Sequence, residues 1–261
     1  MLKGKTALVT GCTAGLGFAT VRELAAEGVN VMMNGFIEAD QVDAKRAGVE
    51  KEFGIKTAYH GADLTQLDQI EDLVATTKKT FGSVDILINN AVFRNFASIP
   101  EMPLDGWNRA MAVNVTAPFL LTKLILPLMR ETGFGRIVNM CSTMSLFAQK
   151  DRSDYVTTKT ALLGLTRATA YELMHDDDIT CNGVCPGSIH TSYSGGKIKE
   201  MAAKEGITED EATKIFLKGR QPSLRFIPDQ HVAKLIVFLC GPHAQMIKGS
   251  GVVIDDGWHV T

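Results

Sequence analysis

The sequence has few cysteines, little net charge and no long apolar run. Its five cysteines contain no CxxC pair and have no histidine-rich neighbour, so we predict neither a disulfide framework nor a metal site. A formal net charge of −2 over 261 residues provides no overall positive field, so nucleic acid is not a predicted partner. The cysteines are Cys12, Cys141, Cys181, Cys185 and Cys240.

The apolar runs are also short. Phe119–Leu121 and Leu235–Cys240 are too short to span a bilayer, so no membrane association is predicted. The first residues, Met1 to Thr6, lead into a strand-like run without the features of a signal peptide, and we expect a cytoplasmic protein. An apolar share of 45% and a charged share of 21% are ordinary for a soluble globular chain.

Strand-like and helical runs alternate along the chain, with no repeat and no break in composition. About seven short apolar runs are separated mostly by helical patterns, which predicts one α/β domain over residues 1–261. We expect a Rossmann-type, doubly wound parallel sheet with helices on both faces, binding its ligands at the carboxyl ends of the strands. Residues 188–221 are polar and weakly periodic, and predict a mobile substrate cover with a single short helix near 209–218.

A glycine-rich loop follows the first strand-like run. Gly11, Gly15 and Gly17 are spaced G-x-x-x-G-x-G and precede a helical pattern. Glycine permits a tight turn and close approach of a pyrophosphate, and the start of a helix attracts its charge. A plain turn is the alternative for such a loop alone. Its place after the first strand, with a second strand following, favours a dinucleotide.

The end of the second strand bears on which dinucleotide binds. Asn34, Gly35 and Phe36 include neither an acid for a ribose hydroxyl nor a base for a 2′-phosphate, and Ala14 in the glycine loop is also uncharged. We therefore predict NAD rather than NADP. Asp63, after the third strand, can hydrogen-bond adenine or cap the next helix, and the sequence leaves both open.

Tyr155 and Lys159 stand four residues apart in a helical stretch and so share one face. A nearby ammonium favours the phenolate, so this tyrosine can exchange protons with an alcohol or ketone near neutral pH. Such a pair alone is more often solvated surface. Its weight rises because Ser142 ends a predicted strand and Asn114 stands among apolar residues, although a buried Asn usually satisfies backbone groups.

Together these motifs resemble the single-domain short-chain dehydrogenases/reductases. The matching set comprises the glycine loop, Asn89-Asn-Ala91, Asn114, Ser142, Tyr155-x-x-x-Lys159 and Pro186-Gly187, in family order over essentially the whole chain. The resemblance implies that Ser142 polarises the substrate oxygen and that Tyr155 is the acid/base. It also implies that Lys159 binds the nicotinamide ribose and that Asn114 supports a water-linked proton relay.

The resemblance further implies a set of coenzyme contacts. One departure is Val92, where the family usually has glycine, and its branched side chain is expected to crowd the coenzyme or the substrate entrance. The implied coenzyme residues are Gly11, Thr13, Gly15, Leu16, Gly17, Phe36, Asp63, Leu64, Asn90, Tyr155, Lys159, Pro186, Gly187, Ile189 and Thr191.

A closer resemblance is to bacterial D-3-hydroxybutyrate dehydrogenases. It is carried by residues 1–5, 34–36, 218–224, 238–239 and 256–258, and it implies NAD and a homotetramer. The substrate pocket departs from that subfamily, because the positions that clamp its carboxylate are Arg94, Met144, Arg152, Ser188 and Lys197 here, with Trp258 retained. These join Ser142 and Tyr155 as the implied substrate-binding set.

The basic residues in this set keep an anionic substrate plausible, since arginine forks well onto carboxylate or sulfonate. Arg94 and Lys197 can equally be solvated rim residues, whereas Arg152 lies three residues before Tyr155 on the side of the site. The leading hypothesis is NAD-dependent interconversion of a secondary alcohol and a ketone, on a small hydroxy or oxo acid related to 3-hydroxybutyrate. The alternatives are a larger, more anionic or non-acid substrate, and a non-catalytic NAD(H)-binding module.

Overall fold

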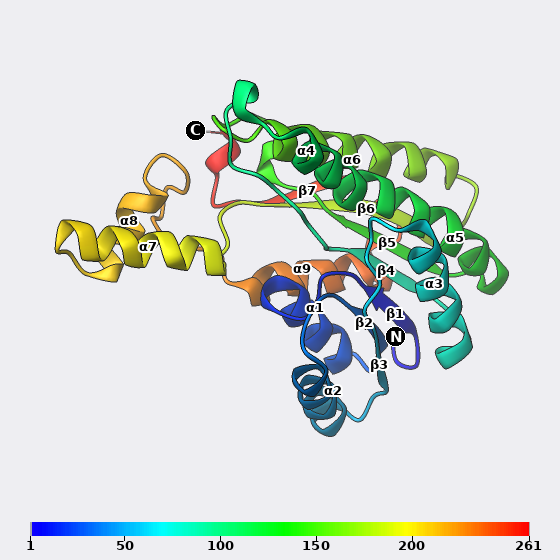
Figure 1. Ribbon diagram of the computed structural model, residues 1–261. Coiled ribbons are helices and arrows are strands. Elements are labelled where there is room, and N and C mark those ends of the chain that lie inside the picture. Colours follow the sequence, from blue (N-terminus) through cyan, green and yellow to red (C-terminus); the bar gives the residue numbers. More distant parts are fainter. Residues whose placement is uncertain (1, 261) are drawn as a thin grey trace.

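The computed structural model describes residues 2–260, apart from the side chain of Ala39, and forms one parallel sheet (Figure 1). Its seven strands run in the order β3-β2-β1-β4-β5-β6-β7, so the direction of winding reverses between β1 and β4. The predicted Rossmann-type sheet is confirmed. The strands are β1 (Thr6–Val9), β2 (Asn30–Asn34), β3 (Thr57–His60), β4 (Ile86–Asn89), β5 (Gly135–Met140), β6 (Ile179–Pro186) and β7 (Gly251–Ile254).

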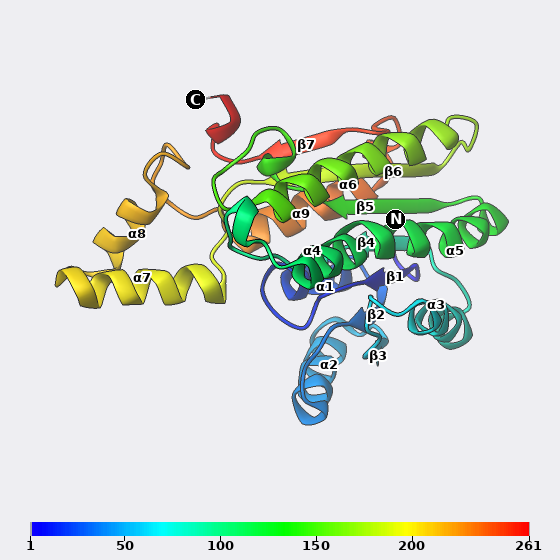
Figure 2. The same ribbon diagram turned by 45° about the horizontal axis from the view of Figure 1, so that its top comes forward.

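Helices cover both faces of the sheet (Figures 1 and 2). One face carries α1 (Gly15–Ala26), α2 (Ala39–Phe53) and α9 (Asp229–Cys240). The other carries α3 (Leu67–Phe81), α4 (Leu104–Met111), α5 (Ala117–Thr132) and α6 (Ser153–Glu172). Each strand residue points to the face opposite its neighbour, so Ala7 and Val9 of β1 enter one core and Leu8 the other.

The helical segment Leu104–Thr132 is interrupted at Asn114, the residue expected to support a proton relay. A π-helical turn, Ala112–Thr116, separates α4 from α5 and contains Asn114. Pro118 follows the π turn by two residues, and its missing N–H and its ring fall on Asn114, four residues earlier; Pro127 lies within α5 without ending it. Single π turns commonly mark functional sites.

This combined segment, Leu104–Thr132, is long and apolar enough to cross a membrane, judged by length and composition only. The expectation that the apolar runs are too short overlooked it, because scattered polar residues divide its hydrophobic ones. Ala117, Leu121 and Ile125 of α5 are fully buried in the second core. The core helix of a soluble protein passes the same test.

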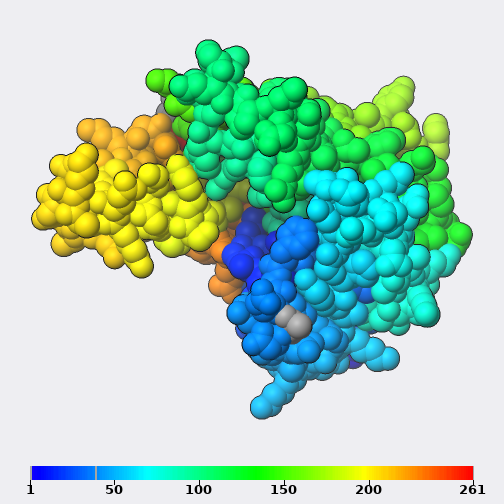
Figure 3. All heavy atoms as spheres, in the orientation of Figure 1, coloured from blue at the N-terminus to red at the C-terminus, as the bar shows by residue number. Residues whose placement is uncertain are grey.

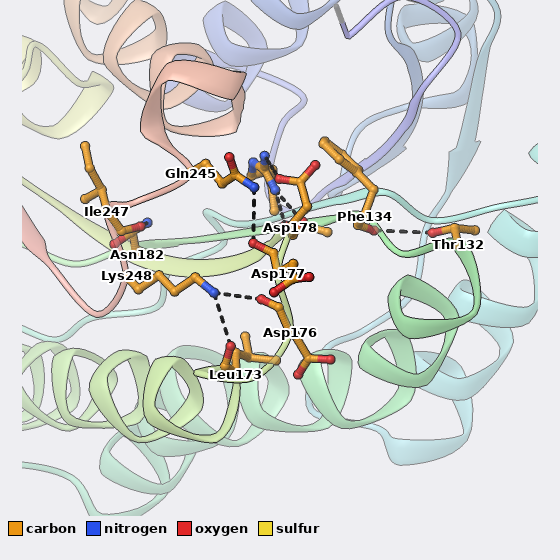
Figure 4. Close-up of polar contacts among 12 residues, drawn as sticks. Thr132, Phe134, Leu173, Asp176, Asp177, Asp178, Asn182, Gln245, Ile247 and Lys248 are labelled. Carbon is orange, nitrogen blue, oxygen red and sulfur yellow. Dashed lines mark hydrogen bonds and ion pairs between the residues drawn. The ribbon is translucent and has the colours of Figure 1, made fainter.

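Polar side chains close the sheet at the amino ends of β5 and β6. Lys248 donates to the carbonyls of Leu173 and Asp176, and Gln245 donates to that of Asp177 (Figure 4). Buried Arg136 donates to the carbonyl of Asp178 at 2.7 Å and to its carboxylate at 2.5 Å. We call this region the amino edge. Its polar side chains donate hydrogen bonds to other groups of the protein and so stabilise the fold.

The predicted cover differs from the expectation. It holds two helices rather than one, α7 (Ser192–Glu205) and α8 (Glu209–Leu217), and they extend beyond the carboxyl ends of the strands (Figures 1 and 2). Each begins with a capping box, at Thr191 and Thr208. The first helix was missed because its apolar stripe is short, and it packs mainly in a small cluster with α8 rather than in the main cores.

Candidate active site

A cavity of about 680 Å³ opens at the carboxyl ends of the central strands. Figure 3 shows the molecule hollowed where the yellow residues of α7 approach the green middle of the chain and the blue N-terminal residues. Every predicted coenzyme residue lines this cavity, as do Ser142 and six of the other predicted substrate residues: Arg94, Met144, Arg152, Tyr155, Ser188 and Trp258. Among the described residues, two predicted positions lie outside the lining, Asn114 and Lys197.

The glycine loop is close-packed against the end of β4. A Cβ on Gly17 would lie 2.5 Å from the carbonyl oxygen of Gly11 and 2.6 Å from Nδ2 of Asn90. Gly11 itself has φ +59, and a Cβ there would lie 2.7 Å from Cα of Ala91. Asn90 donates to the carbonyls of Thr10 and Gly11, so its side chain braces the loop. These glycines are therefore required by packing as well as by any ligand.

The start of α1 faces the cavity without a side-chain cap. Ala14 is its N-cap residue and supplies no capping hydrogen bond, unlike Thr191 and Thr208 at the starts of α7 and α8. The first N–H groups of a helix then need acceptors from elsewhere, and an anion at the positive helix end meets that need. The loop and helix together fit a dinucleotide pyrophosphate.

The end of β2 is neutral and tightly held. Asn34 belongs to the strand and is buried, and its side-chain amide donates to the carbonyls of His60 and Ala62, so its N–H donors are used within the protein. Tyr59 donates to the carbonyl of Gly35, which leaves Phe36 as the exposed residue of the tip. Around this end of the cavity, the described lining residues include no lysine or arginine.

Asp63 has a local structural use. Its carboxylate accepts hydrogen bonds from the N–H and the hydroxyl of Thr65, both at 2.9 Å. Asp63 thus stabilises a turn before α3 and is not its N-cap residue, which is Gln66. Because Asp63 also lines the cavity, a contact with adenine stays a prediction.

Tyr155 and Lys159 lie together on α6, as their spacing predicts. Nζ of Lys159 is 5.6 Å from the centre of the Tyr155 ring and donates to the carbonyl of Met140 at 2.5 Å. Lys159 is only 2% exposed and forms no ion pair with any residue that the structure describes. An ammonium has three N–H donors and is costly to bury without partners. The remaining donors of Lys159 are thus available to a ligand in the cavity.

Ser142 stands directly after β5, on the same side of the cavity. Its Oγ accepts from the N–H of Met144, and its own N–H donates to Ser145, which in turn donates to the carbonyl of Lys159. This capping box fixes the Ser142 hydroxyl relative to α6. Within residues 2–260 the Ser142 hydroxyl donates to no protein group, so its proton can go to a substrate oxygen.

Asn114 is not among the residues that line the cavity, and its support of a water-linked proton relay stays a prediction. Its Oδ1 accepts from the N–H of Phe93, and its Nδ2 donates to the carbonyl of Phe93 and to Thr158. These bonds agree with the alternative that a buried Asn satisfies backbone groups of its surroundings. Asn114 acts as a positioning residue for the segment that follows β4.

That segment carries Arg94, and it is fixed on both sides. Phe93 is held by Asn114, and Asn95 donates from its N–H and side chain to Asp154, which is buried at the start of α6. The guanidinium of Arg94 lies 5.7 Å from the centre of the Tyr155 ring. Arg94 is therefore a half-buried wall of the site rather than a solvated rim residue.

Arg152 directly precedes α6 and is half-buried. Its guanidinium lies 3.6 Å from the centre of the Phe96 ring, a cation–π contact that leaves its N–H edge free. Burial lowers the pKa of Arg152, and the charge of Arg94 lowers it further. Both guanidiniums lie near the Phe96 ring, Arg94 at 5.5 Å and Arg152 at 3.6 Å from its centre, and neither has a carboxylate partner among the described residues.

Lys197 is a correction. It lies on α7 outside the cavity lining and pairs with Glu200 at 2.9 Å on the surface. The sequence placed it by resemblance, but α7 directs residue 197 away from the site. The solvated-rim alternative therefore holds for Lys197 and fails for Arg94.

The remaining predicted residues shape the pocket. Met144 and Trp258 are mostly buried, and Trp258 packs edge-on against Phe147 at 5.0 Å. Ser188 lines the cavity with a small side chain, and its N–H donates to Gln221 at the base of the cover. Val92 is 48% exposed and lines the cavity, where its branched side chain narrows the space.

Four residues of this region were missed by reasoning from the sequence. Asp154 holds the Arg94 segment, Phe96 and Tyr193 stack at 4.2 Å across the cavity mouth, and Arg220 reaches the lining from the cover. Charged and aromatic residues are common in polar stretches, so nothing in the sequence marked these four residues as part of the site. Only folding brings residues so distant in sequence together.

The chain matches the model of the short chain dehydrogenase family over residues 5–202. The chain belongs to this family. It is therefore an oxidoreductase of the class that works with a nicotinamide dinucleotide, and the resemblance noted in its motifs is confirmed. The match covers the glycine loop, Ser142, Tyr155 and Lys159.

Two bacterial relatives extend along the whole chain. A D-beta-hydroxybutyrate dehydrogenase of Cupriavidus necator is 38% identical over 258 residues, covering 99% of each chain. One of Rhizobium meliloti is 36% identical, covering 97% of this chain and 98% of the relative. Among solved structures, L-sorbose reductase of Gluconobacter frateurii with NADPH and L-sorbose has a TM-score of 0.94 and 26% identity, covering 100% of this chain and 98% of that one.

Proposed function

We propose that this enzyme interconverts a secondary alcohol and a ketone with NAD, on a hydroxy or oxo acid related to 3-hydroxybutyrate. The observation that carries the proposal is Lys159, a buried ammonium with a single protein acceptor, beside Tyr155 in the cavity. A free Ser142 hydroxyl stands at the end of the adjoining strand. Three such groups at one cavity suit proton exchange with a carbinol oxygen.

The coenzyme fits the other end of the cavity. The glycine loop would take the pyrophosphate, and Lys159 would donate to the nicotinamide ribose. When bound, the nicotinamide accepts or supplies the hydride of the reaction. NAD is favoured over NADP because the described lining near Gly35 and Phe36 offers no positive side chain for a 2′-phosphate.

The protein's own steps follow from the three fixed groups. Ser142 donates a hydrogen bond to the substrate oxygen, Tyr155 exchanges a proton with that oxygen, and the Lys159 ammonium stabilises negative charge at the phenol. Asn114 and Asp154 keep the Arg94 segment against this constellation. Positioned acid–base catalysis of this kind contributes about 10²–10⁴-fold to a rate.

An anionic substrate is supported by Arg94 and Arg152. Both are half-buried, line the cavity and lack a carboxylate partner among the described residues. Arginine binds a carboxylate through two parallel hydrogen bonds, which also fixes its orientation. Met144 makes one wall of the pocket apolar, and the small side chain of Ser188 leaves room at another. A substrate larger than 3-hydroxybutyrate is therefore the alternative within the same chemistry.

We also propose a homotetramer, from the relationship to bacterial hydroxybutyrate dehydrogenases. Phe119 on α5 and Tyr171 on α6 are 48% and 75% exposed, and offer apolar surface for subunit contacts. Light scattering after size-exclusion chromatography measures the mass directly, and a monomer would contradict the proposal. A cytoplasmic location stays a prediction from the sequence.

The function is tested by following NADH absorbance with purified enzyme. 3-Hydroxybutyrate and butan-2-ol, each with NAD and with NADP, separate the substrate and coenzyme predictions. We expect the acid to be preferred by about 10–100-fold in kcat/KM, since one charge-assisted bidentate pair contributes about 1.5–3 kcal/mol. Arg152→Gln should reduce that preference. Equal use of both alcohols contradicts the anionic site, and no oxidation in a wide panel despite NADH binding favours the non-catalytic module.

A further inference from the structure

Four arginines line the cavity: Arg94 and Arg152 are half-buried, Arg109 on α4 is exposed, and Arg220 reaches the cavity from the cover. Arg220 lies in the turn after α8, half-buried, with its guanidinium 4.4 Å from the centre of the Phe216 ring. Burial lowers the pKa of Arg220, and its charge acts on Arg152 and Tyr193. The residue next to it, Gln221, accepts a hydrogen bond from the N–H of Ser188 at the end of β6, which places Arg220 at the substrate end of the cavity and not at the end near Phe36.

Aromatic rings hold these arginines by their faces. Phe96 and Tyr193 stack at 4.2 Å, Arg94 lies 5.5 and 5.8 Å from their two centres, and Arg152 lies on the Phe96 ring. A guanidinium stacked on a ring keeps its N–H donors in the plane free for an oxyanion. The Phe96–Tyr193 stack thus presents the N–H edges of Arg94 and Arg152, and Phe216 holds Arg220 in the same way from the cover.

The charges at this end are unbalanced. Arg94, Arg152 and Arg220 have no ion-pair partner in the part of the chain that the structure describes. The single acidic residue in the described lining is Asp63, which belongs with the glycine loop end. Arginines stay protonated at neutral pH, so half-burying three of them together is unfavourable until anions arrive.

We propose that the substrate carries two anionic groups, one held by Arg94 and Arg152 beside Tyr155 and the second held by Arg220. This rests on the proposed function and narrows it to hydroxy or oxo acids with a second carboxylate or sulfonate. One carboxylate has acceptor sites enough for two guanidinium forks, and a monoanion would leave Arg220 without a partner. Because Arg220 belongs to the cover, the second anion also joins the cover to the body.

The test uses unreactive acids, so that it does not depend on turnover. Binding of butyrate, succinate, glutarate and adipate to the enzyme–NADH complex is measured by calorimetry. We expect the best dicarboxylate to bind at least about 10-fold tighter than butyrate, as an added charge-assisted bond of about 1.5 kcal/mol requires. Arg220→Gln should remove this advantage, because it weakens dicarboxylate binding much more than butyrate binding, and Arg220→Lys should restore part of it.

Arg225→Gln is the matched control, because Arg225 is exposed five residues further on and does not line the cavity. It should leave every affinity unchanged. If no dicarboxylate binds tighter than butyrate, or if Arg220→Gln weakens butyrate equally, the proposal is overturned. Failure of the proposed function is seen separately, as an absence of NADH formation from mono- and dianionic hydroxy acids alike.

Discussion

The two edges of the sheet treat their polar groups in opposite ways. At the amino edge, Arg136 and Lys248 donate to buried carbonyls and carboxylates of the protein itself. At the carboxyl edge, Lys159, Ser142 and three arginines retain donors that no described residue accepts. Both edges contain buried cations, so burial of charge does not distinguish them. The position of the unused donors does: Nε of Arg136 is buried without an acceptor and away from the cavity, whereas the unused donors of the carboxyl edge belong to residues that line the cavity, and these locate the function.

The largest expected effect tests the carboxyl edge. Tyr155→Phe removes the hydroxyl that exchanges the proton, so kcat should fall about 10³-fold, within the usual range for a lost acid–base group. NADH affinity and the thermal midpoint should change little, because the hydrogen bonds that Tyr155 forms with Asp154 and Thr158 use its backbone, and no residue of the range 2–260 is bonded to its hydroxyl. Steady-state kinetics and NADH fluorescence measure the two separately.

Tyr171→Phe provides the control on the same helix, since Tyr171 lies outside the cavity lining and the substitution keeps its ring for the proposed subunit contact. It should keep full activity. If Tyr155→Phe retained its activity, the phenol would have no part in the mechanism, and the proposed difference between the two edges would be contradicted.

The next effect tests the amino edge. Arg136→Met leaves the carbonyls of Gly135 and Asp178 without their donor, and should lower the free energy of unfolding by about 3 kcal/mol. At a temperature where the variant is folded, kcat/KM should equal that of the wild type. Urea unfolding and kinetics on one preparation measure both.

Arg130→Met is the comparison, because Arg130 pairs with Asp176 on the surface. An exposed pair contributes about 0–1 kcal/mol, so this variant should unfold almost like the wild type. A loss of activity in folded Arg136→Met would mean that the amino edge also supports the site.

The smallest expected effect concerns Gly17, where one substitution should change both the stability of the protein and its binding of NADH. In Gly17→Ala the added methyl would overlap the Gly11 carbonyl, which must move, at a cost of about 1–3 kcal/mol in stability. The shifted loop should also weaken NADH binding several-fold. Calorimetry of NADH binding and urea unfolding check the two parts.

Gly48→Ala in α2 is matched to it, because a methyl there meets nothing within 4 Å. It should stabilise the protein by about 0.5–1 kcal/mol through helix propensity and leave NADH binding unchanged. Equal behaviour of the two variants would mean that the glycine loop has no packing constraint.

Much of the site could be predicted because its signals are local. The spacing of Gly11, Gly15 and Gly17, and of Tyr155 and Lys159, follows from turn and helix geometry, which holds wherever the segments are placed. The first helix of the cover was missed for the converse reason. Its apolar residues pack on α8 in a small cluster of their own, so its stripe is too short to read from the sequence.

The sequence by itself determined the parallel sheet, the glycine loop and the catalytic pair, because period and spacing along the chain decide them. Only the tertiary structure decided which basic residues face the substrate. It put Arg220 among the cavity residues with Arg94 and Arg152, sent Lys197 to the surface, and used Asn114 to hold a loop. The physical reason is that the packing of helices and loops decides which distant residues a side chain meets. The local pattern of the sequence does not specify that packing.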